Sequence, residues 1–337
     1  MHKQPLISFC IPTYNRAPFL AETLKSILAQ AGPDIEIVIS DNASTDGTEA
    51  IVADFKKNYS AVQYARNESN LGYDRNLLRA IGLARGEYIW LFGSDDLLKE
   101  GAIEAVREKI LNVPLRPTLV YINHEIFSRA RGLLIPCQVS CRVDRDLDVT
   151  GCLRLLGLNL GFMSALVLPR EQLQGLKIRP ELLGLGWIHL HLVLGLLQAG
   201  GSIQYVGRPY VAAGKDATPC YDYTEIFVEH LDRVLWSARN WGYSRATICR
   251  MVSYTIRHYH FRVILSWRCD NEETLRKAFP KFLKAYWRYP WFWILLVPAR
   301  YSPRSVILAV RNFVRYGERE KWREAAARDA SGTSGLG

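Results

Sequence analysis

Two adjacent aspartates, Asp95 and Asp96, follow the apolar run EYIWLF and the pair Gly93-Ser94. Like charges at the end of a buried strand repel each other, and a buried carboxylate without a partner is costly. Mg²⁺ or Mn²⁺ suits such a place, because these cations bind one or two carboxylates and take their other ligands from phosphates and water. The pair therefore indicates a metal site that offsets charge on a departing diphosphate. The alternative is a solvated turn that caps a helix beginning near Lys99.

Two earlier loops also carry polar groups directly after apolar runs. In PTYNR, Tyr14 offers a flat face to a base, and Arg16 offers a fork of donors to phosphate. In SDNASTDGT, Asp41 can accept a hydrogen bond from a pyrimidine N–H. The alternative for the first loop is a plain proline-containing turn.

A third loop, NLGYDRN, has the pattern of a helix start. Gly72 permits a tight turn, and the N-terminus of the helix after it would face an anion. Arg75 and Asn76 are expected to project from the first helical turn. The alternative is a helix cap with surface charges.

The elements that position these loops alternate along the first hundred residues. Alternating strands and helices predict a largely parallel sheet with helices on both faces, and ligands bind such sheets at the carboxyl ends of the strands. We therefore expect the loops to surround one ligand. The expected strands cover 6–12, 35–40, 62–66 and 87–92, and the expected helices cover 18–30, 46–59 and 73–86.

A second strand-rich stretch follows, and the chain is mostly helical from about residue 221. The expected strands are 118–127, 161–169 and 202–211, and a helix over 184–201 ends at Gly200 and Gly201. The predicted domains are 1–215, with a donor half over 1–100 and an acceptor half over 101–215, then a helical region over 216–324 and a disordered tail over 325–337.

Composition restricts the class of protein. In 337 residues, 49% hydrophobic and 23% charged residues indicate a globular chain. Seven scattered cysteines without a C-x-x-C pair favour reduced thiols in a cytosolic protein over a disulfide framework or a zinc site. The sequence shows no secretory signal pattern and no apolar run of about 18 residues, the length that a spanning helix requires.

The net charge of +10 resides in the C-terminal region. Residues 241–324 hold 17 Lys and Arg against 6 Asp and Glu, a balance of +11. A helix expected from Ser302 and Pro303 places apolar residues on one face and arginines on another. This pattern suits an interfacial helix on an anionic membrane; the alternative is a packed helix with solvated arginines. The apolar residues are Val306, Ile307, Val310, Phe313 and Val314, and the arginines are Arg304, Arg311 and Arg315.

The charge alone suggests nucleic-acid binding, since phosphate attraction needs no particular sequence. No recognition motif accompanies the charge, so we expect no nucleic-acid partner.

Four motifs in order, SFCIPTYNR, IVISDNASTDGT, NLGYDRN and GSDD, resemble the inverting, nucleotide-sugar-dependent glycosyltransferases of family 2, which have the GT-A fold. The likeness is strong over residues 5–100 and weaker to about 212. It is nearest to transferases that build bacterial O-antigen and other surface polysaccharides. It implies a Rossmann-like GT-A domain plus the helical, basic C-terminal region.

The resemblance implies roles for individual residues. It assigns the nucleotide-sugar pocket to Pro12, Tyr14, Arg16, Asp41, Asn70, Arg75, Ser94 and Asp95. The metal motif of the family has an acid, a spacer and an aspartate. Here Gly93 replaces the first acid, which leaves Asp95 as the matching Mg²⁺ or Mn²⁺ ligand, with Asp96 beside it as a second ligand and a catalytic candidate.

The family also carries an acidic pair at the start of a late helix, whose aspartate deprotonates the acceptor. That aspartate position falls on His189, and histidine can take a proton near neutral pH. Trp187 is the candidate for stacking on an acceptor sugar. The alternative is that His189 and His191 are ordinary helix residues and that the base lies elsewhere.

The resemblance implies a glycosyltransferase that moves a sugar from a nucleoside diphosphate to a glycan hydroxyl, with inversion at the anomeric carbon. The acceptor is expected to be lipid-linked, and the enzyme to lie in the cytoplasm on the inner face of the plasma membrane. The departures at Gly93 and His189 also allow a non-catalytic nucleotide-sugar-binding protein of the same fold. The sugar, nucleotide, linkage and oligomeric state stay open, and the loops over 128–160 and 212–222 are expected to set specificity.

Overall fold

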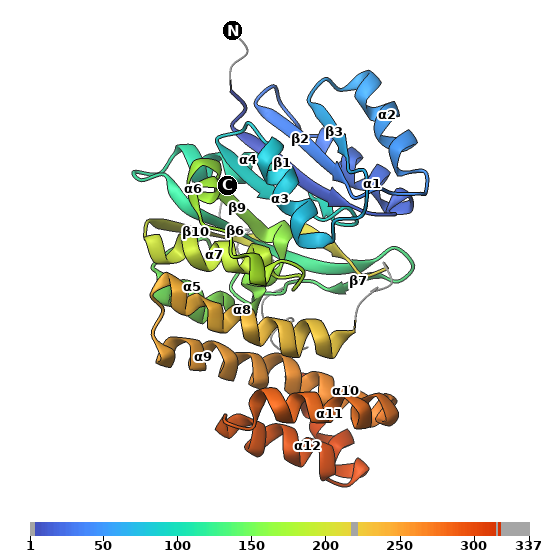
Figure 1. The fold of residues 1–337 in the computed structure, drawn as a ribbon, viewed down its shortest axis with the longest axis vertical. Coiled ribbons are helices and arrows are strands. Elements are labelled where there is room, and N and C mark those ends of the chain that lie inside the picture. Colours follow the sequence, from blue (N-terminus) through green and yellow to red (C-terminus); the bar gives the residue numbers. More distant parts are fainter. Residues whose placement is uncertain (1–3, 217–221, 315, 318–337) are drawn as a thin grey trace, which may run out of the picture. The chain divides into compact units, whose positions relative to one another are not determined.

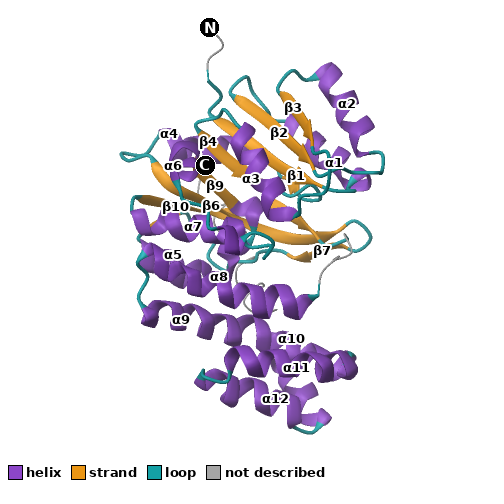
Figure 2. Ribbon diagram, viewed as in Figure 1, coloured by secondary structure: helices purple, strands orange, loops and turns teal. Residues whose placement is uncertain are grey.

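The computed structural model describes residues 4–216, 222–314 and 316–317. Its contacts divide the chain into two compact units, residues 1–219 and 220–337. The first unit has α/β structure and the second is helical (Figure 2). The predicted tail over 325–337 lies outside the described residues.

One mixed sheet of ten described strands forms the centre of the first unit. Its N-terminal part is parallel, with strand order β3-β2-β1-β4. This order continues through β9, β6, β10 and β5, where β10 is parallel to β6 and β9 is antiparallel to both of its neighbours. The parallel N-terminal strands are β1 (Ile7–Thr13), β2 (Ile35–Asp41), β3 (Val62–Arg66) and β4 (Tyr88–Leu91).

The later strands are less regular. The two long ones are β6 (Pro117–Ser128) and β10 (Ser202–Gly214), and β9 (Leu166–Pro169) separates β6 from β4. Three short strands lie at the margins: β5 (Leu97–Leu98), β7 (Gly132–Ile135) and β8 (Arg145–Leu147).

Helices cover both faces of the sheet (Figure 1). Along β1, the side chains of Ile7, Phe9 and Ile11 join a core with apolar residues of α1, α2 and α4. Alternate residues of a strand point to opposite faces, and accordingly Cys10 contacts α3 on the other side. The predicted two-faced, mostly parallel architecture is therefore confirmed. The helices are α1 (Ala17–Leu28), α2 (Thr48–Asn58), α3 (Tyr73–Leu83), α4 (Ala102–Leu111), α5 (Val149–Leu156), α6 (Arg170–Gly175) and α7 (Ile188–Ala199).

Two boundaries differ from the prediction for a physical reason. The strand expected over 161–169 begins only at Leu166, because the preceding residues form 3₁₀ turns. Ser164 within those turns is fully buried and accepts the Trp90 indole N–H at 2.9 Å through its carbonyl. The helix expected from residue 184 begins at Ile188, because Gly184 and Gly186 have φ of +92° and +77°.

The second unit is helical, as predicted. Its helices are α8 (Leu231–Ser237), α9 (Arg245–Thr255), α10 (Phe261–Asp270), α11 (Glu272–Tyr286) and α12 (Val297–Tyr301), with a further helix over 304–314. Turns of π-helix, Glu225–His230, Ile256–His260 and Phe292–Leu296, precede α8, α10 and α12. Among the described residues, no helix is long and apolar enough to cross a bilayer.

The helix over 304–314 does not present the expected arginine face. Arg304 donates to the Cys269 carbonyl at 2.7 Å, and Arg311 pairs with Asp270 at 2.9 Å, so both arginines are held against the C-terminal end of α10. Ile307 on the expected apolar face is only 3% exposed. Arg315 lies outside the described residues.

Candidate active site

The predicted ligand-binding loops follow the carboxyl ends of the parallel strands. Because β2 and β3 lie on one side of β1 and β4 on the other, the strand order reverses between β1 and β4. Open α/β sheets bind ligands at such a switch point. The loops after β1 and β4, which carry Tyr14 and Asp95, flank it.

The loops after β1 and β2 interlock. The Asn42 N–H donates to the Thr13 carbonyl at 2.9 Å. The Asn15 N–H donates to Ser44 Oγ at 2.9 Å, and Asn15 Oδ1 accepts the Thr45 N–H at 2.8 Å. Asn15 has a φ of +51°, which asparagine tolerates better than most residues. The turn after β1 is therefore fixed against the loop after β2.

Three buried asparagines attach the loop after β3 to the same edge. Asn76 Oδ1 accepts from Ser40 Oγ at 2.8 Å and from Asn67 Nδ2 at 3.0 Å. Asn42 Oδ1 accepts from Asn67 Nδ2 at 2.9 Å and from the Leu71 N–H at 2.8 Å. Buried amides are costly unless they are hydrogen-bonded, and here each bond also fixes a loop. The expectation that Asn76 projects outward is wrong, because its side chain belongs to this cluster.

Two candidate nucleotide contacts are accessible at this edge. Tyr14 is 42% exposed and Arg75 is exposed, and within the described residues neither side chain forms a hydrogen bond or ion pair. Asn70 is also exposed, although its Oδ1 accepts from Asn42 Nδ2 at 2.6 Å. Pro12 is buried within β1. Tyr14 and Arg75 are thus the side chains most open to a ligand.

Asp41 is fully buried and already hydrogen-bonded. Its Oδ2 accepts from the Tyr64 hydroxyl at 2.6 Å, and its Oδ1 accepts the Ser44 N–H at 2.9 Å. Burial, followed by the hydrogen bond to Asp41, raises the pKa of Tyr64 above its usual range. Asp41 therefore orders the loop after β2, and its contact with a base stays a prediction.

The two adjacent aspartates have different environments. Asp96 is 5% exposed, its Oδ1 accepts the Gly214 N–H at 2.9 Å, and its Oδ2 accepts from Ser164 Oγ. Burial first, and the neighbouring Asp95 second, raise the pKa of Asp96 to about 7. Asp96 is therefore a packed carboxyl that joins β4 to β10. Ser94 beside them is also buried, with 6% exposure.

Asp95 is more accessible and lies between cations. Burial raises the pKa of its carboxyl, and Arg16 and Arg129 oppose that shift. Arg129 Nη2 donates to the Asp95 carbonyl at 3.3 Å, and its guanidinium lies 4.7 Å from the Phe19 ring centroid. Sequence reasoning did not identify Arg129, which belongs to a loop with no local motif.

Packing explains why the usual first acid is absent. A Cβ built at Gly93 would lie 2.6 Å from Asp96 Oδ2 and 3.3 Å from Asp95 Oδ1. The first distance is shorter than real Cβ contacts allow. A side chain at residue 93 would therefore require the Asp96 carboxylate to shift from this position.

The donor set limits how a metal can bind. Within the part of the chain that the structure describes, no three His, Cys, Asp or Glu side chains group as metal ligands. Each oxygen of Asp96 already accepts one hydrogen bond from a protein group, and the residue is 5% exposed, so Asp96 is the less accessible aspartate and its role as a second ligand stays a prediction. Asp95 fits a Mg²⁺-type ion, which can take its remaining ligands from phosphates and water.

His189 is buried and bonded at both ring nitrogens. Its Nε2 lies 2.8 Å from the Gly161 carbonyl, and its Nδ1 lies 3.3 Å from the Tyr73 hydroxyl. A carbonyl only accepts, so we assign the proton to Nε2, and Nδ1 then accepts from Tyr73. Burial lowers the pKa of His189, so the ring is neutral at pH 7.

Trp187 has no open face. It is 5% exposed and stacks on His189 with ring centroids 5.7 Å apart. The indole also packs closely against Gly161, where a built Cβ would lie 2.5 Å from the ring. Sugar stacking by Trp187 therefore stays a prediction that requires the ring to become exposed.

Asp74, which sequence reasoning did not single out, holds the start of α7. Its Oδ2 accepts the N–H groups of Gly184 at 2.8 Å and Gly186 at 2.9 Å, and its Oδ1 accepts the Ile188 N–H at 3.2 Å. The first N–H groups of a helix have no intrahelical partner, and a carboxylate there also meets the helix dipole favourably. The start of α3 thus positions His189 and also carries Arg75.

Comparison with known proteins supports one family. The family model described as glycosyl transferase family 2 matches residues 8–134. The curated abequosyltransferase RfbV of Salmonella typhimurium is 34% identical over 226 residues, which cover 63% of this chain and 67% of RfbV. The GalNAc(5)-diNAcBac-PP-undecaprenol beta-1,3-glucosyltransferase of Campylobacter jejuni is 32% identical over 106 residues, which cover 31% of this chain and 34% of that relative.

Solved structures share the fold. Residues 1–349 of TarS from S. aureus, in complex with UDP-GlcNAc, align with a TM-score of 0.65 and 17% identity over 97% of this chain and 92% of that chain. The mannosyltransferase PcManGT from Pyrobaculum calidifontis, in complex with GDP-Man and Mn²⁺, aligns with a TM-score of 0.54 and 19% identity, covering 97% and 88%. These likenesses confirm the predicted GT-A architecture. Together with the family model and the extent of the match to RfbV, they show that the chain belongs to glycosyl transferase family 2 and is a glycosyltransferase.

Proposed function

We propose that this glycosyltransferase moves a sugar from a nucleoside diphosphate to a hydroxyl of a surface-polysaccharide acceptor, such as a growing O-antigen, on the inner face of the plasma membrane. The observation that carries the proposal lies at the sheet edge where the loops after β1, β2 and β3 meet, which we call the donor edge. Tyr14 and Arg75 are exposed there and have no side-chain partner among the described residues, while hydrogen bonds hold their loops in place. The names of the relatives support a sugar-transfer role.

On the donor side, each accessible group has a distinct task. Tyr14 stacks on the base, and Arg75 and Arg16 bind the diphosphate. Arginine suits this task because its planar fork donates two hydrogen bonds to one anionic group. The donor pocket is completed by Asp41, Asn70 and the Ser94 backbone.

Asp95 holds the metal ion in this proposal. When bound, a divalent cation neutralises charge on the diphosphate as it departs. Arg16 and Arg129 already place positive charge beside Asp95, so they supply part of the same stabilisation. Asp96 keeps Asp95 in place through its bonds to Ser164 and Gly214.

The acceptor hydroxyl attacks the anomeric carbon on the face opposite the diphosphate. One C–O bond forms as the bond to the phosphate oxygen breaks, which inverts the anomeric centre. The hydroxyl proton must leave, and His189 Nδ1 is the group that receives it. Since Tyr73 now donates to that nitrogen, the proton passes either after Tyr73 moves aside or through its hydroxyl.

Substitutions of these two side chains test the base. In the His189→Ala variant we expect kcat to fall at least about 100-fold, the usual contribution of a general base. The Kd of the donor should stay within a factor of two, because His189 is not a donor contact. Tyr73→Phe separates the two routes for the proton: direct transfer predicts little change, and transfer through the hydroxyl predicts a loss similar to that of His189→Ala. Near wild-type turnover by His189→Ala would remove the residue from the mechanism.

The acceptor is lipid-linked in this proposal, and the helical unit supports membrane contact. Trp287 and Trp293 are 52% and 53% exposed, and the Trp293 indole N–H donates to the backbone carbonyl of Trp287 at 2.7 Å, which places the Trp293 side chain beside the Trp287 backbone. Ile294, Tyr301 and Phe313 are also exposed. Tryptophan and tyrosine favour the membrane–water boundary. In this proposal these exposed side chains take the place of the arginine face that the sequence suggested.

Flotation with liposomes of anionic and of neutral lipid tests this contact. The Trp287→Ala/Trp293→Ala variant should lose most of its binding to anionic liposomes. The control Tyr59→Ala, an exposed aromatic of the first unit, should bind as the wild type does. Equal flotation of all three proteins would refute a role for the two tryptophans.

A further inference from the structure

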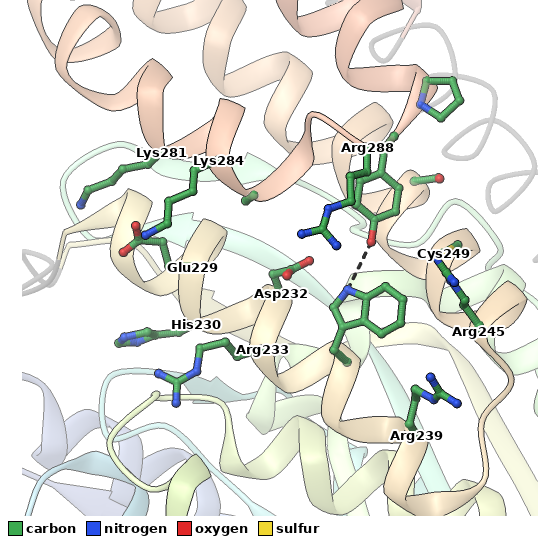
Figure 3. A pocket seen from close by; sticks show the side chains of 15 residues that line it. Glu229, His230, Asp232, Arg233, Arg239, Arg245, Cys249, Lys281, Lys284 and Arg288 are labelled. Atoms are coloured by element: carbon green, nitrogen blue, oxygen red, sulfur yellow. Dashed lines mark hydrogen bonds between the residues drawn. The ribbon is translucent and has the colours of Figure 1, made fainter.

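A cavity of about 830 Å³ lies within the helical unit (Figure 3). Its lining comes from α8 with the residues on either side of it, from α9, and from the C-terminal end of α11 with the turn after it. Small-molecule sites typically measure roughly 300–1,000 Å³. The cavity shares no residue with the donor edge or with the His189 site.

Cationic side chains dominate this lining. Six Lys and Arg face two acids, Glu229 and Asp232, which gives a formal balance of +4. Like charges around a common space repel one another, so an anion between them would be stabilising. The six cations are Arg233, Arg239, Arg245, Lys281, Lys284 and Arg288.

Three of these cations are not paired. Lys281 forms an ion pair with Asp222 at 3.0 Å. Arg239, Arg245 and Lys284, in contrast, form no ion pair with any residue that the structure describes. They come from three different helical segments, and Figure 3 shows them around the same space.

Asp232, one of the two acids in the lining, is partly compensated. Burial raises the pKa of Asp232 to about 6, and Arg288 opposes that shift. The charge of Arg288 therefore acts on this carboxyl, and Arg239, Arg245 and Lys284 stay available to an external anion.

The lining of the cavity contacts one exposed tryptophan. The Trp236 indole N–H donates to the Tyr289 hydroxyl at 3.2 Å, and both aromatic residues line the cavity. Arg288, an exposed residue of the lining, lies 5.5 Å from the ring centroid of Trp287. Trp287 and Trp293 are the exposed tryptophans described above. The cationic cavity thus has Trp287 beside one of its arginines, and the Trp293 side chain beside the Trp287 backbone.

We propose that this cavity binds the phosphate or diphosphate group of a lipid, whose hydrocarbon chain leaves across Trp287 and Trp293. Arginine and lysine form charge-assisted hydrogen bonds with phosphate oxygens, and the indoles cover the first part of the chain. A nucleic acid fits less well, because binding a strand requires an extended basic groove, whereas these cations surround a cavity of small-molecule size. The inference rests on the proposed function in one respect: it takes the bound lipid to be the anchor of the acceptor glycan.

Calorimetric titration of the full chain with farnesyl diphosphate tests the proposal. The cavity variant Arg245→Gln/Lys284→Gln should raise the Kd at least tenfold, about 1.4 kcal/mol. The control Arg250→Gln/Arg276→Gln removes the same charge from exposed positions on the same two helices outside the cavity, and its Kd should change less than twofold. Equal changes in both variants, or no binding by the wild type, would overturn the proposal.

Two further measurements distinguish a lipid diphosphate from free pyrophosphate and from a membrane headgroup. Inorganic pyrophosphate should bind the wild type at least tenfold more weakly than farnesyl diphosphate, and equal affinity would overturn the lipid assignment. The cavity variant should still float with phosphatidylglycerol vesicles. If it loses flotation but keeps its affinity for farnesyl diphosphate, the site binds a membrane headgroup and the proposal is wrong.

A single-stranded RNA oligonucleotide that bound more tightly than the lipid, and only with the cavity intact, would also overturn the proposal. Nucleotide release from the donor is measured separately on the wild type. Its absence would refute the proposed function and would leave the lipid-phosphate result standing.

Discussion

Replacing Asp74 should destabilise the first unit strongly, because this side chain holds the start of α7. Asp74 is 1% exposed, and its carboxylate accepts three backbone N–H groups, from Gly184, Gly186 and Ile188. Removing the carboxylate leaves these donors without their acceptor; Ile188 is buried, whereas Gly184 is exposed and can reach water. The same change frees the helix that carries His189.

The magnitude follows from the number of bonds. A hydrogen bond to a charged group contributes about 1.5–3 kcal/mol. Such contributions are not additive, and the glycine-containing turn can relax, so we expect Asp74→Ala to cost about 3–5 kcal/mol in unfolding free energy. In Asp74→Asn, the amide oxygen can serve Gly184 and Gly186 while the NH₂ group faces the Ile188 N–H. That variant should lose about 1.5–3 kcal/mol, one bond and the charge.

Urea unfolding followed by circular dichroism measures both costs. The control is Asp54→Ala on α2, an exposed acid whose partner Lys57 is also exposed; it should cost at most about 0.5 kcal/mol. If Asp74→Ala falls within about 0.5 kcal/mol of the wild type, the carboxylate does not hold α7. If Asp74→Asn costs as much as Asp74→Ala, the division of the three bonds between the two oxygens is wrong.

Two further predictions concern the aspartate pair. The folded state keeps the proton of Asp96 up to about pH 7, whereas the unfolded chain releases it near pH 3.8. The unfolding free energy of the wild type should therefore fall as the pH rises from 4 to 7. Asp96→Asn should lack this slope, and parallel pH curves for the two proteins would contradict the assignment. Gly93→Asp restores the family acid but places a Cβ 2.6 Å from Asp96 Oδ2, so it should destabilise by about 1–3 kcal/mol without tightening Mn²⁺ binding in calorimetry. A fully stable variant with tighter Mn²⁺ binding would show that residue 93 has room for a ligand.

The sequence predicted most of the first four strands and the helices between them. Strands that are buried on both faces read as continuous apolar runs, and β1 and β2 are buried at every position. The polar loops that follow them were predicted for the same reason, since parallel strands must end at one edge. The short strand β5 was not predicted, because two residues carry no periodic pattern.

The partners of the site residues were harder to predict. Asp96 accepts hydrogen bonds from Ser164 and Gly214, which lie 68 and 118 residues further along the chain. Asp74 resembles an ordinary acid in the first turn of a helix, yet its partners begin at Gly184, 110 residues away. No local pattern encodes such long-range pairs, so the sequence could identify the loops but not which aspartate is packed and which is open.

The central claim is that the donor diphosphate binds at the edge where Arg75 and Asp95 lie. Titration with nucleoside diphosphates and their sugars, beginning with UDP and GDP, tests it most directly by comparing Arg75→Gln with Arg79→Gln. Both arginines are exposed and lie one turn apart on α3, so the two variants remove the same charge from the same helix. For the nucleotide that binds the wild type, Arg75→Gln should raise the Kd at least tenfold and Arg79→Gln less than twofold. Equal Kd values for both variants and the wild type would contradict a diphosphate site at this edge.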